Sequence, residues 1–278
     1  MNEIKNYGFV APIVDEKEQY VLGDGWFGGA VLMPGGHGWG RFLPGEETQA
    51  KNGIDTYNCS NYGTLNALET IGRKKYGNVF QSNLSERYTG VLTGTIPGVG
   101  NDPQKVIENI RTFCGVVPEV FLPFDNTINT VQKYYSPNPM PYWLFATGKH
   151  WLKKYKVSHS WVFLNNDTLA EKQRKMKDAL QYSPLGCAGY AWDQHADGLY
   201  YGHPTIFNHW YMVFDFEDGK YWLAYDSYDK TIKKLAWNYN FGYSKMYGLD
   251  LQPANTPYTP TADYISYIAY RLGAIFGK

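Results

Sequence analysis

Residues 55–69 read DTYNCSNYGTLNALE, and this stretch determines how the rest of the chain is interpreted. A cysteine, Cys59, is followed by apolar residues at helical spacing: Tyr62, Leu65, Leu68 and Ile71. This spacing predicts a helix with Cys59 at its N-terminus and Gly77 as its stop. Backbone N–H groups and the helix dipole stabilise an anion in the first turn of a helix, so this position favours the thiolate form of Cys59.

The chain has two other cysteines, and their predicted surroundings are different. Cys114 ends a helix predicted from Asn101-Asp102-Pro103, where the helix dipole opposes a negative charge. Cys187 lies within an apolar predicted strand and is interpreted as a small buried hydrophobe. Three cysteines give neither a disulfide framework nor a paired metal-binding spacing, which is typical of a reducing compartment. We therefore expect Cys59 to be the reactive thiol.

A predicted β-hairpin between residues 208 and 228 supplies a histidine and a carboxylate. Asp218-Gly219 is a strong turn pair, and a two-residue turn there pairs Glu217 with Lys220. In that register the apolar face pairs Met212 with Tyr225, Phe214 with Leu223, and Phe216 with Tyr221. On the other face His209 lies opposite Tyr228 and diagonal to Asp226. Diagonal neighbours have Cβ atoms roughly 7–8 Å apart, so an imidazole and a carboxylate can meet.

Cys59, His209 and Asp226 together have the chemistry of a catalytic triad. A histidine base can take the proton of the thiol, while a carboxylate orients the imidazole and stabilises its cation. His209 follows Cys59 by about 150 residues, which is within the separation found in papain and cathepsin-type enzymes. No metal or organic cofactor is needed for this chemistry, and His195, His203 and Asp193 lack a recognised metal-ligand spacing.

The order of these segments resembles the papain family of cysteine peptidases. Residues 55–69 look like the region of that family where a strand leads into the nucleophile helix. Further similar segments are Leu84-Ser85-Glu86, residues 176–192, Asn208-His209 and residues 219–228, and the match covers roughly residues 45–235. The family's Cys-Gly-Ser-Cys-Trp signature is absent. Asp226 stands where the family has Asn, and Tyr228 stands where it has Trp.

The resemblance implies an α+β, two-lobed fold in which a helical lobe is followed by an antiparallel β lobe. It also implies a cysteine endopeptidase that works through a thioester on a peptide or protein substrate. The family's oxyanion hole uses a Gln before the cysteine together with the cysteine N–H. Gln49 is the first candidate for that donor, and Asn52 is the alternative.

The chain divides into three predicted parts. Residues 1–45 form a Gly- and aromatic-rich arm, which is similar to divergent family members encoded by phages and gut bacteria. Residues 46–240 form the peptidase domain, in which a capping box at Thr168–Glu171 starts a further helix. Residues 241–278 form an extension whose amphipathic helix docks on its own domain or contacts a partner through one apolar face, made of Ile265, Ile268, Leu272 and Ile275.

The composition narrows the function classes. Lys and Arg number 26, as do Asp and Glu, and the resulting net charge of zero argues against nucleic acid or an anionic membrane as the main partner. Neither a secretory signal nor an apolar stretch long enough to span a bilayer is visible. We therefore expect a soluble, cytoplasmic or virion-associated protein.

Two alternatives to a peptidase remain open at this point. A related amidase or acyl transferase would use the same three residues on a cell-wall or other non-protein amide. A catalytically inactive relative would keep the fold for binding or as a structural protein, for example in a virion. The altered cysteine signature favours this second alternative.

Overall fold

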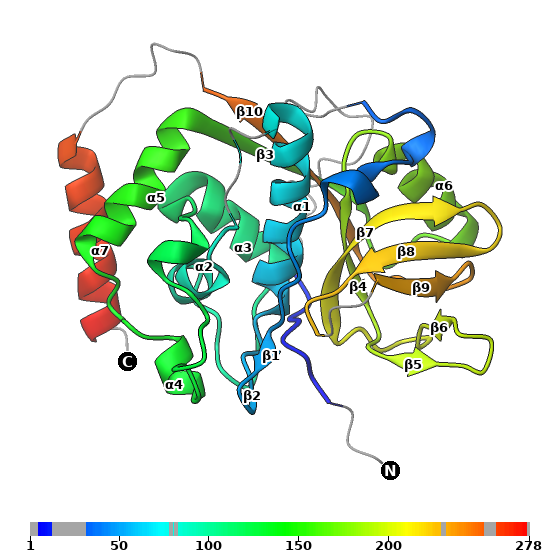
Figure 1. Ribbon diagram of the computed structural model, residues 1–278, viewed down its shortest axis with the longest axis horizontal. Coiled ribbons are helices and arrows are strands. Elements are labelled where there is room, and N and C mark those ends of the chain that lie inside the picture. The colour runs from blue at the N-terminus through cyan, green and yellow to red at the C-terminus, as the bar shows by residue number, and fades with distance from the viewer. Residues whose placement is uncertain are drawn as a thin grey trace.

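The computed structural model describes residues 5–12, 32–77, 80, 83–228, 232–252 and 260–276, so residues 1–4 and 13–31 of the predicted arm lie outside it. Helices α2, α3, α4, α5 and α7 gather on one side, most of the large sheet lies on the other side together with α6, and α1 lies between them (Figure 1). The described helices are α1 Cys59–Tyr76, α2 Glu86–Leu92, α3 Pro103–Asn109, α4 Val131–Tyr134, α5 Tyr142–Lys154, α6 Leu169–Leu180 and α7 Pro260–Phe276. Short helical turns are η2 Pro34–Gly36, η3 Trp39–Phe42, η5 Ile110–Cys114 and η6 Glu119–Phe121.

The strands of the described residues form one small and one large sheet. The small sheet pairs β1 Ala50–Lys51 with β2 Ile54–Asp55. The large sheet has the order β3-β10-β4-β7-β8-β9-β6-β5, and its pairs are antiparallel except β6 with β9. Its strands are β3 Tyr155–Phe163, β4 Leu185–Gly189, β5 Asp193–Gln194, β6 Tyr200–Tyr201, β7 His209–Glu217, β8 Tyr221–Tyr225, β9 Ile232–Ala236 and β10 Ser244–Leu251. The predicted α+β fold, with a helical region followed by an antiparallel β region, is confirmed.

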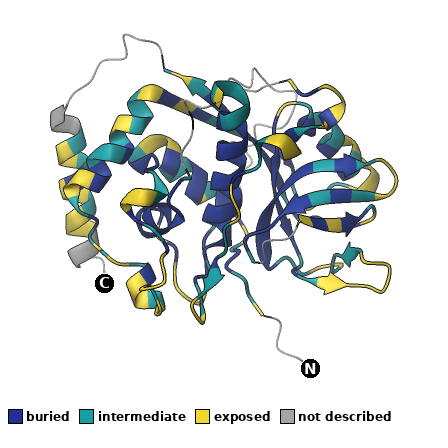
Figure 2. Ribbon diagram, in the orientation of Figure 1, coloured by how far each residue is buried: buried dark blue, intermediate teal, exposed yellow. Residues whose placement is uncertain are grey.

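Helix α1 is the central element of the core. Every residue from Cys59 to Gly72 is buried, which Figure 2 shows as an almost continuous dark helix between the two regions. A Cβ atom on Gly63 would lie 2.8 Å from the ring of Trp210 and 3.1 Å from the backbone of Tyr211. Because Gly63 has no side chain, α1 can lie directly against β7.

Local signals placed three helices correctly. Helix α1 begins at Cys59, and Gly77 caps its C-terminus. Asp102 caps α3 by accepting a hydrogen bond from the Gln104 N–H at 2.7 Å. The predicted capping box of Thr168 with Glu171 is present at the start of α6.

The register of the β7–β8 hairpin corrects part of the prediction. Glu217 pairs with Tyr221, not with Lys220, because the turn has three residues instead of two. The predicted pairs of Phe214 with Leu223 and of Phe216 with Tyr221 are therefore wrong. An irregularity between Val213 and Asp215 adds one residue to β7, and this restores the predicted pairing of Met212 with Tyr225. The two one-residue shifts cancel, so His209 stays on the face of Asp226.

The C-terminal residues differ from the predicted extension in two ways. Strand β10 pairs with both β3 and β4, so the boundary predicted at residue 240 falls inside a region that is continuous with the sheet. Helix α7 packs on α5 through Tyr267 and Tyr270, whose rings contact Phe145. The helix therefore docks on its own domain, but not through the predicted aliphatic face, of which Ile265, Ile268 and Leu272 are exposed. The side chain of Ile275 lies outside the described residues. Aromatic packing on α5, which the aliphatic pattern does not reveal, determines the orientation of this helix.

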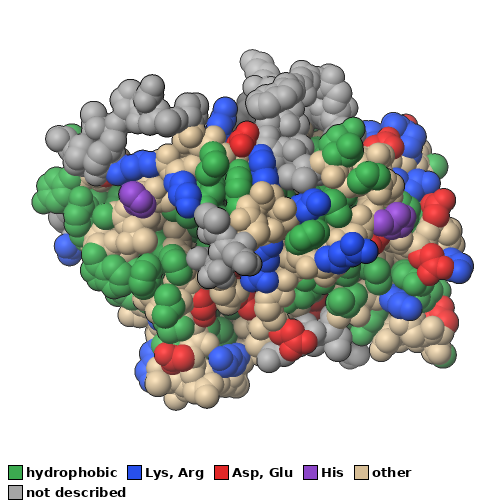
Figure 3. Space-filling model, turned by 45° about the horizontal axis from the view of Figure 1, so that its top comes forward, with side chains coloured by type: hydrophobic (Ala, Val, Ile, Leu, Met, Phe, Trp, Pro, Cys, Tyr) green, Lys and Arg blue, Asp and Glu red, His purple; other side chains and the backbone are tan. Residues whose placement is uncertain are grey.

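The surface has no dominant charge on the face drawn in Figure 3, where basic and acidic side chains are interspersed. This agrees with the balanced composition of 26 basic and 26 acidic residues. Among the described residues, no helix has the length and apolar character needed to cross a bilayer.

Candidate active site

Cys59 is the first residue of α1 and is completely buried. The chain reaches it through Tyr57, whose positive φ of 56° turns the backbone sharply from β2 into the helix. Burial raises the pKa of the Cys59 thiol, although the Trp210 backbone and the Ser60 side chain lower it, and the charge of Asp226 raises it further. Burial thus opposes the thiolate form that the position at the helix start favours.

His209 begins β7 and is also completely buried. Its Nε2 donates a hydrogen bond to Oδ1 of Asp226 at 2.6 Å. Its Nδ1 is buried and has no hydrogen-bond partner among the described residues. The imidazole therefore keeps one ring nitrogen available as an acceptor, and Cys59 is not hydrogen-bonded to it in this conformation.

Four aromatic rings surround the His209 imidazole. The centroid distances are 5.7 Å to Tyr7, 5.6 Å to Trp192, 5.8 Å to Tyr211 and 5.6 Å to Tyr228. These rings exclude water from the ring and fix its plane. The predicted meeting of His209 and Asp226 on one face of the hairpin is observed as a direct hydrogen bond.

Asp226 has a second charged partner, Lys233, which sequence reasoning missed. Lys233 lies on β9, is 1% exposed, and places Nζ 3.0 Å from Oδ2 of Asp226. Burial alone would raise the pKa of Asp226, but its contacts with His209 and Lys233 lower it, so the carboxylate is ionised. Lys233 also lies 4.8 Å from the ring centroid of Trp192. Strand alternation is the signal that could have revealed Lys233. Its neighbours Ile232 and Lys234 are exposed, so the side chain of Lys233 lies on the buried face of β9.

Gln49 is buried and held beside the residue that follows Asp226. Its backbone N–H donates to the Ser227 carbonyl at 2.7 Å, and its Oε1 accepts from the Ser227 hydroxyl at 3.0 Å. Its Nε2 donates to Asp55 Oδ1 at 3.3 Å, and the same oxygen accepts from the Tyr57 N–H at 3.0 Å. Gln49 is thus fixed to the segment that leads into Cys59.

Asn52, the alternative donor, lies in a different environment. It is exposed in the turn between β1 and β2, and its Nδ2 donates to the carbonyls of Asp125 and Ile128 at 2.8 and 2.9 Å. Its amide is therefore engaged by a loop of the helical region.

The N-terminal segment of residues 5–10 lies across these residues. The Tyr7 N–H donates to the Asn208 carbonyl at 3.0 Å, next to His209. The Tyr7 carbonyl accepts from Nε2 of Gln49 at 3.0 Å. The Asn208 amide donates to the Lys5 carbonyl at 2.8 Å. The segment is thus held by groups on both sides of His209.

At Phe9 the same segment contacts the helical region and packs near Cys59. Asn101 forms a parallel bridge with Phe9, in which its N–H donates to Gly8 and its carbonyl accepts from Val10, both at 3.0 Å. The Phe9 ring stacks on Trp210 at 6.0 Å. A small buried cluster, separate from the main core, consists of Phe9, Cys59, Trp161, Ala188 and Trp210. The segment therefore forms part of the cover over the thiol and the imidazole.

The arrangement contains the parts that nucleophilic thiol chemistry requires. A cysteine lies at a helix N-terminus, and an ionised carboxylate holds one nitrogen of a histidine whose other ring nitrogen has no partner in the described part of the chain. An amide donor, Gln49, lies in the segment before the cysteine and contacts a backbone carbonyl.

Comparisons with known proteins agree with this fold. No protein-family profile and no curated protein matches the sequence. Solved structures of papain-like cysteine proteases do match. Digestive procathepsin L2 proteinase from Tenebrio molitor larval midgut has a TM-score of 0.55 at 14% identity, over 87% of this chain and 78% of that one. The bromelain protease from Ananas comosus, in complex with the E64 inhibitor, has a TM-score of 0.51 at 18% identity. The match covers 76% of this chain and 97% of bromelain.

A bacterial structure is similar to the same degree. Cwp84, a surface-layer-associated cysteine protease of Clostridium difficile, has a TM-score of 0.55 at 15% identity, over 82% of this chain and 54% of that one. At these identities the similarity establishes the papain-like fold that the chain shares with cysteine proteases.

Proposed function

We propose that this chain is a cysteine endopeptidase in which Cys59 is the nucleophile, His209 the general base and Asp226 the group that orients the histidine. The observation that carries the proposal is the buried hydrogen bond from His209 Nε2 to Asp226 Oδ1, which leaves Nδ1 without a partner among the residues that the structure describes. Because the ionised Asp226 can only accept, Nε2 must carry the hydrogen, and Nδ1 is then the atom that can take a proton.

The proposed reaction passes through a thioester. His209 Nδ1 takes the proton of Cys59, and the thiolate attacks the carbonyl carbon of a peptide bond. The resulting oxyanion accepts hydrogen bonds from Gln49 Nε2 and the Cys59 N–H. His209 then gives its proton to the leaving amine as the C–N bond breaks. A water molecule, deprotonated by His209, hydrolyses the thioester and releases the acid and the thiol.

The contact between Gln49 and Tyr7 supports the oxyanion role. Gln49 Nε2 already donates to a peptide carbonyl, that of Tyr7, at 3.0 Å. A donor that holds a backbone carbonyl in this position is suited to hold the carbonyl of a substrate. Its side-chain oxygen is fixed by Ser227, so the amide group points its N–H in a defined direction.

Residues 5–10 have to leave the site before a substrate can bind. Tyr7 contacts the His209 ring and Gln49, while Phe9 packs in the cluster that contains Cys59. We therefore propose that the chain as described is a masked form, and that displacement or removal of its N-terminal segment unmasks the cysteine.

The second candidate function is that of a catalytically inactive binding protein, and the state of Cys59 favours it. Cys59 and His209 are fully buried, they are not hydrogen-bonded to each other in this conformation, and the thiol pKa is raised. An amidase or acyl transferase would use the same residues on a different amide, so the choice of substrate distinguishes it.

Hydrolysis of a quenched fluorescent peptide library tests the proposal. The wild-type chain and the chain without residues 1–12 are compared with Cys59→Ser in each background. Cys187→Ser is the matched control, because Cys187 is equally buried but lies away from the helix start. The proposal requires cleavage that Cys59→Ser abolishes and Cys187→Ser leaves intact. Cleavage of no peptide by either length of chain would contradict it.

A further inference from the structure

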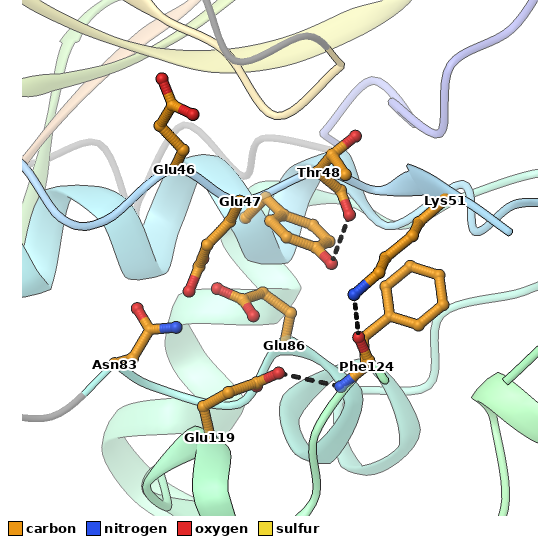
Figure 4. A pocket seen from close by; sticks show the side chains of 9 residues that line it. Glu46, Glu47, Thr48, Lys51, Asn83, Glu86, Glu119 and Phe124 are labelled. Carbon is orange, nitrogen blue, oxygen red and sulfur yellow. Dashed lines mark hydrogen bonds between the residues drawn. The ribbon is translucent and has the colours of Figure 1, made fainter. Parts of the chain in front are cut away.

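A pocket of about 230 Å³ lies between the segment before Gln49, the start of α2 and the loop after η6. Figure 4 shows the side chains of Glu47, Glu86 and Glu119, the last of these from η6, converging on it. Its lining residues are Glu46, Glu47, Thr48, Lys51, Tyr62, Asn83, Glu86, Glu119 and Phe124. The proposed catalytic residues are not among them.

Several buried oxygen atoms in and beside this pocket lack partners. Glu86 is 3% exposed, and its Oε1 makes no hydrogen bond to any described residue. The same holds for both carboxylate oxygens of Glu47, for Oε2 of Glu119 and for the amide oxygen Oδ1 of Asn83. Glu69, which is completely buried, adds another unpartnered oxygen from α1. Buried polar oxygens without partners are costly and therefore rare in folded proteins.

The nearest basic side chains do not neutralise these carboxylates. Lys51 donates to the Phe124 carbonyl at 2.8 Å, and Arg73 donates to the Leu43 carbonyl at 2.8 Å. Among the ion pairs between described residues, none includes Glu47, Glu69, Glu86 or Glu119. Burial accordingly raises the pKa of all four carboxyls, that of Glu119 to about 7. A cation bound among them would displace their protons.

We propose that this pocket binds a divalent cation, with Ca²⁺ as the ion that fits it best. The available donors are all oxygen atoms, which is the ligand type that Ca²⁺ prefers, and Ca²⁺ accepts irregular coordination. No three His, Cys, Asp or Glu side chains within the described ranges are grouped closely enough to hold a metal together. The site therefore uses the carboxylates of Glu47 and Glu86 with the amide oxygen of Asn83, and the cavity volume leaves room for water ligands. Glu119 contributes charge from the other side of the pocket.

Such an ion would connect parts of the chain that are far apart in sequence. Glu47 lies two residues before Gln49, and the intervening Thr48 carbonyl accepts from the Tyr62 hydroxyl of α1 at 3.2 Å. Glu86 is the first residue of α2. The ion would thus tie the segment that carries Gln49 to both helices. The binding itself does not depend on peptidase activity.

Calorimetry and thermal unfolding of the full chain test this inference. The chain is treated with chelator and then titrated with CaCl₂ or MgCl₂ at constant ionic strength. We expect one saturable Ca²⁺ site, and a rise in Tm of roughly 5–10 °C at a Ca²⁺ concentration 100 times the Kd. Mg²⁺ binds more weakly, because it demands regular octahedral geometry and gives up its water reluctantly.

Three variants examine the donor set. Glu47→Gln and Glu86→Gln each weaken Ca²⁺ binding at least about tenfold, which is the effect of losing 1.4 kcal/mol of binding free energy. Glu217→Gln is the matched control, because that carboxylate is exposed at the end of β7 and pairs with Lys220. Should Glu86→Gln fail to fold, the more exposed Glu47→Gln still decides the question. Absence of binding heat, a Tm that responds no more to CaCl₂ than to NaCl, or equal affinity in wild type and Glu47→Gln would overturn the inference.

Discussion

The carbonyl oxygen of Tyr7 accepts a hydrogen bond of 3.0 Å from the Gln49 side chain, the group that we propose as the oxyanion donor. The backbone of the chain's own N-terminal segment thus occupies the place where the carbonyl of a substrate would be held. The ring of the same tyrosine lies against the imidazole of His209. Accessibility of Cys59 is therefore the first property on which the account can be tested.

Removing residues 1–12 should make Cys59 react faster with iodoacetamide. Phe9 and Tyr7 no longer cover the site, so the thiol gains solvent and its burial, the main cause of its raised pKa, is reduced. We expect at least about a tenfold increase in rate, the change that follows when opening becomes 1.4 kcal/mol easier. Mass spectrometry locates the label, and Cys187 in the sheet provides the internal control. An unchanged rate at Cys59 would argue against the mask.

Lys233→Met should destabilise the fold. Removing one partner of a buried ion pair typically costs about 3–5 kcal/mol, because the carboxylate of Asp226 then has one cation fewer. Urea unfolding measures the loss. The double variant Lys233→Met with Asp226→Asn should recover much of it, since an amide needs no charged partner. Equal stability of Lys233→Met and wild type would mean that the pair contributes nothing.

Gly63→Ala tests the close packing of α1 on β7. The added methyl group meets the ring of Trp210 and the backbone of Tyr211, so we expect a loss of about 1–3 kcal/mol in the free energy of unfolding. Gly273→Ala in α7 is the matched change in a helix with open space around it, and it should be neutral or stabilise by up to about 1 kcal/mol. The pair is compared by urea unfolding, and similar effects of both substitutions would refute the close-approach argument.

Gln49→Ala should lower kcat/KM by about 10²- to 10³-fold once a cleaved peptide is known, as the loss of one oxyanion donor does elsewhere. Asn52→Ala, the control, should leave kcat/KM unchanged, because its amide binds the loop at Asp125 and Ile128. If only Asn52→Ala lowered kcat/KM, Asn52 and not Gln49 would be the oxyanion donor.

Local signals explain why some elements could be predicted from the sequence. The starts of α3 and α6 depend on the capping residues Asp102 and Thr168, which act within a few positions along the chain. Helix α1 has no side-chain cap, and its start was predicted from the apolar spacing that follows Cys59. Helix α5 has no such side-chain cap, since Pro141 precedes it. Strand β10 lies between β3 and β4, an arrangement decided by long-range pairing that no local pattern reveals.

The same distinction applies to the site. His209 and Asp226 meet within one hairpin, so their contact followed from the register even though the bulge and the three-residue turn were not foreseen. Lys233 comes from the next strand. Tyr7 lies 202 residues from His209 in sequence, and its place over the ring depends on the tertiary fold. The buried carboxylates at Glu47 and Glu86 likewise come together only in the folded chain.

The most direct test of the proposed triad is the rate at which E-64 or iodoacetamide labels Cys59 between pH 4 and 9. It should be measured for wild type and His209→Ala, with and without residues 1–12. We expect unmasked wild type to react near pH 6 at least about 100-fold faster than unmasked His209→Ala, within the range that a positioned acid–base group contributes. Equal rates in the two, rising with pH as for an ordinary thiol, would contradict the assignment of Cys59 and His209 as a catalytic pair.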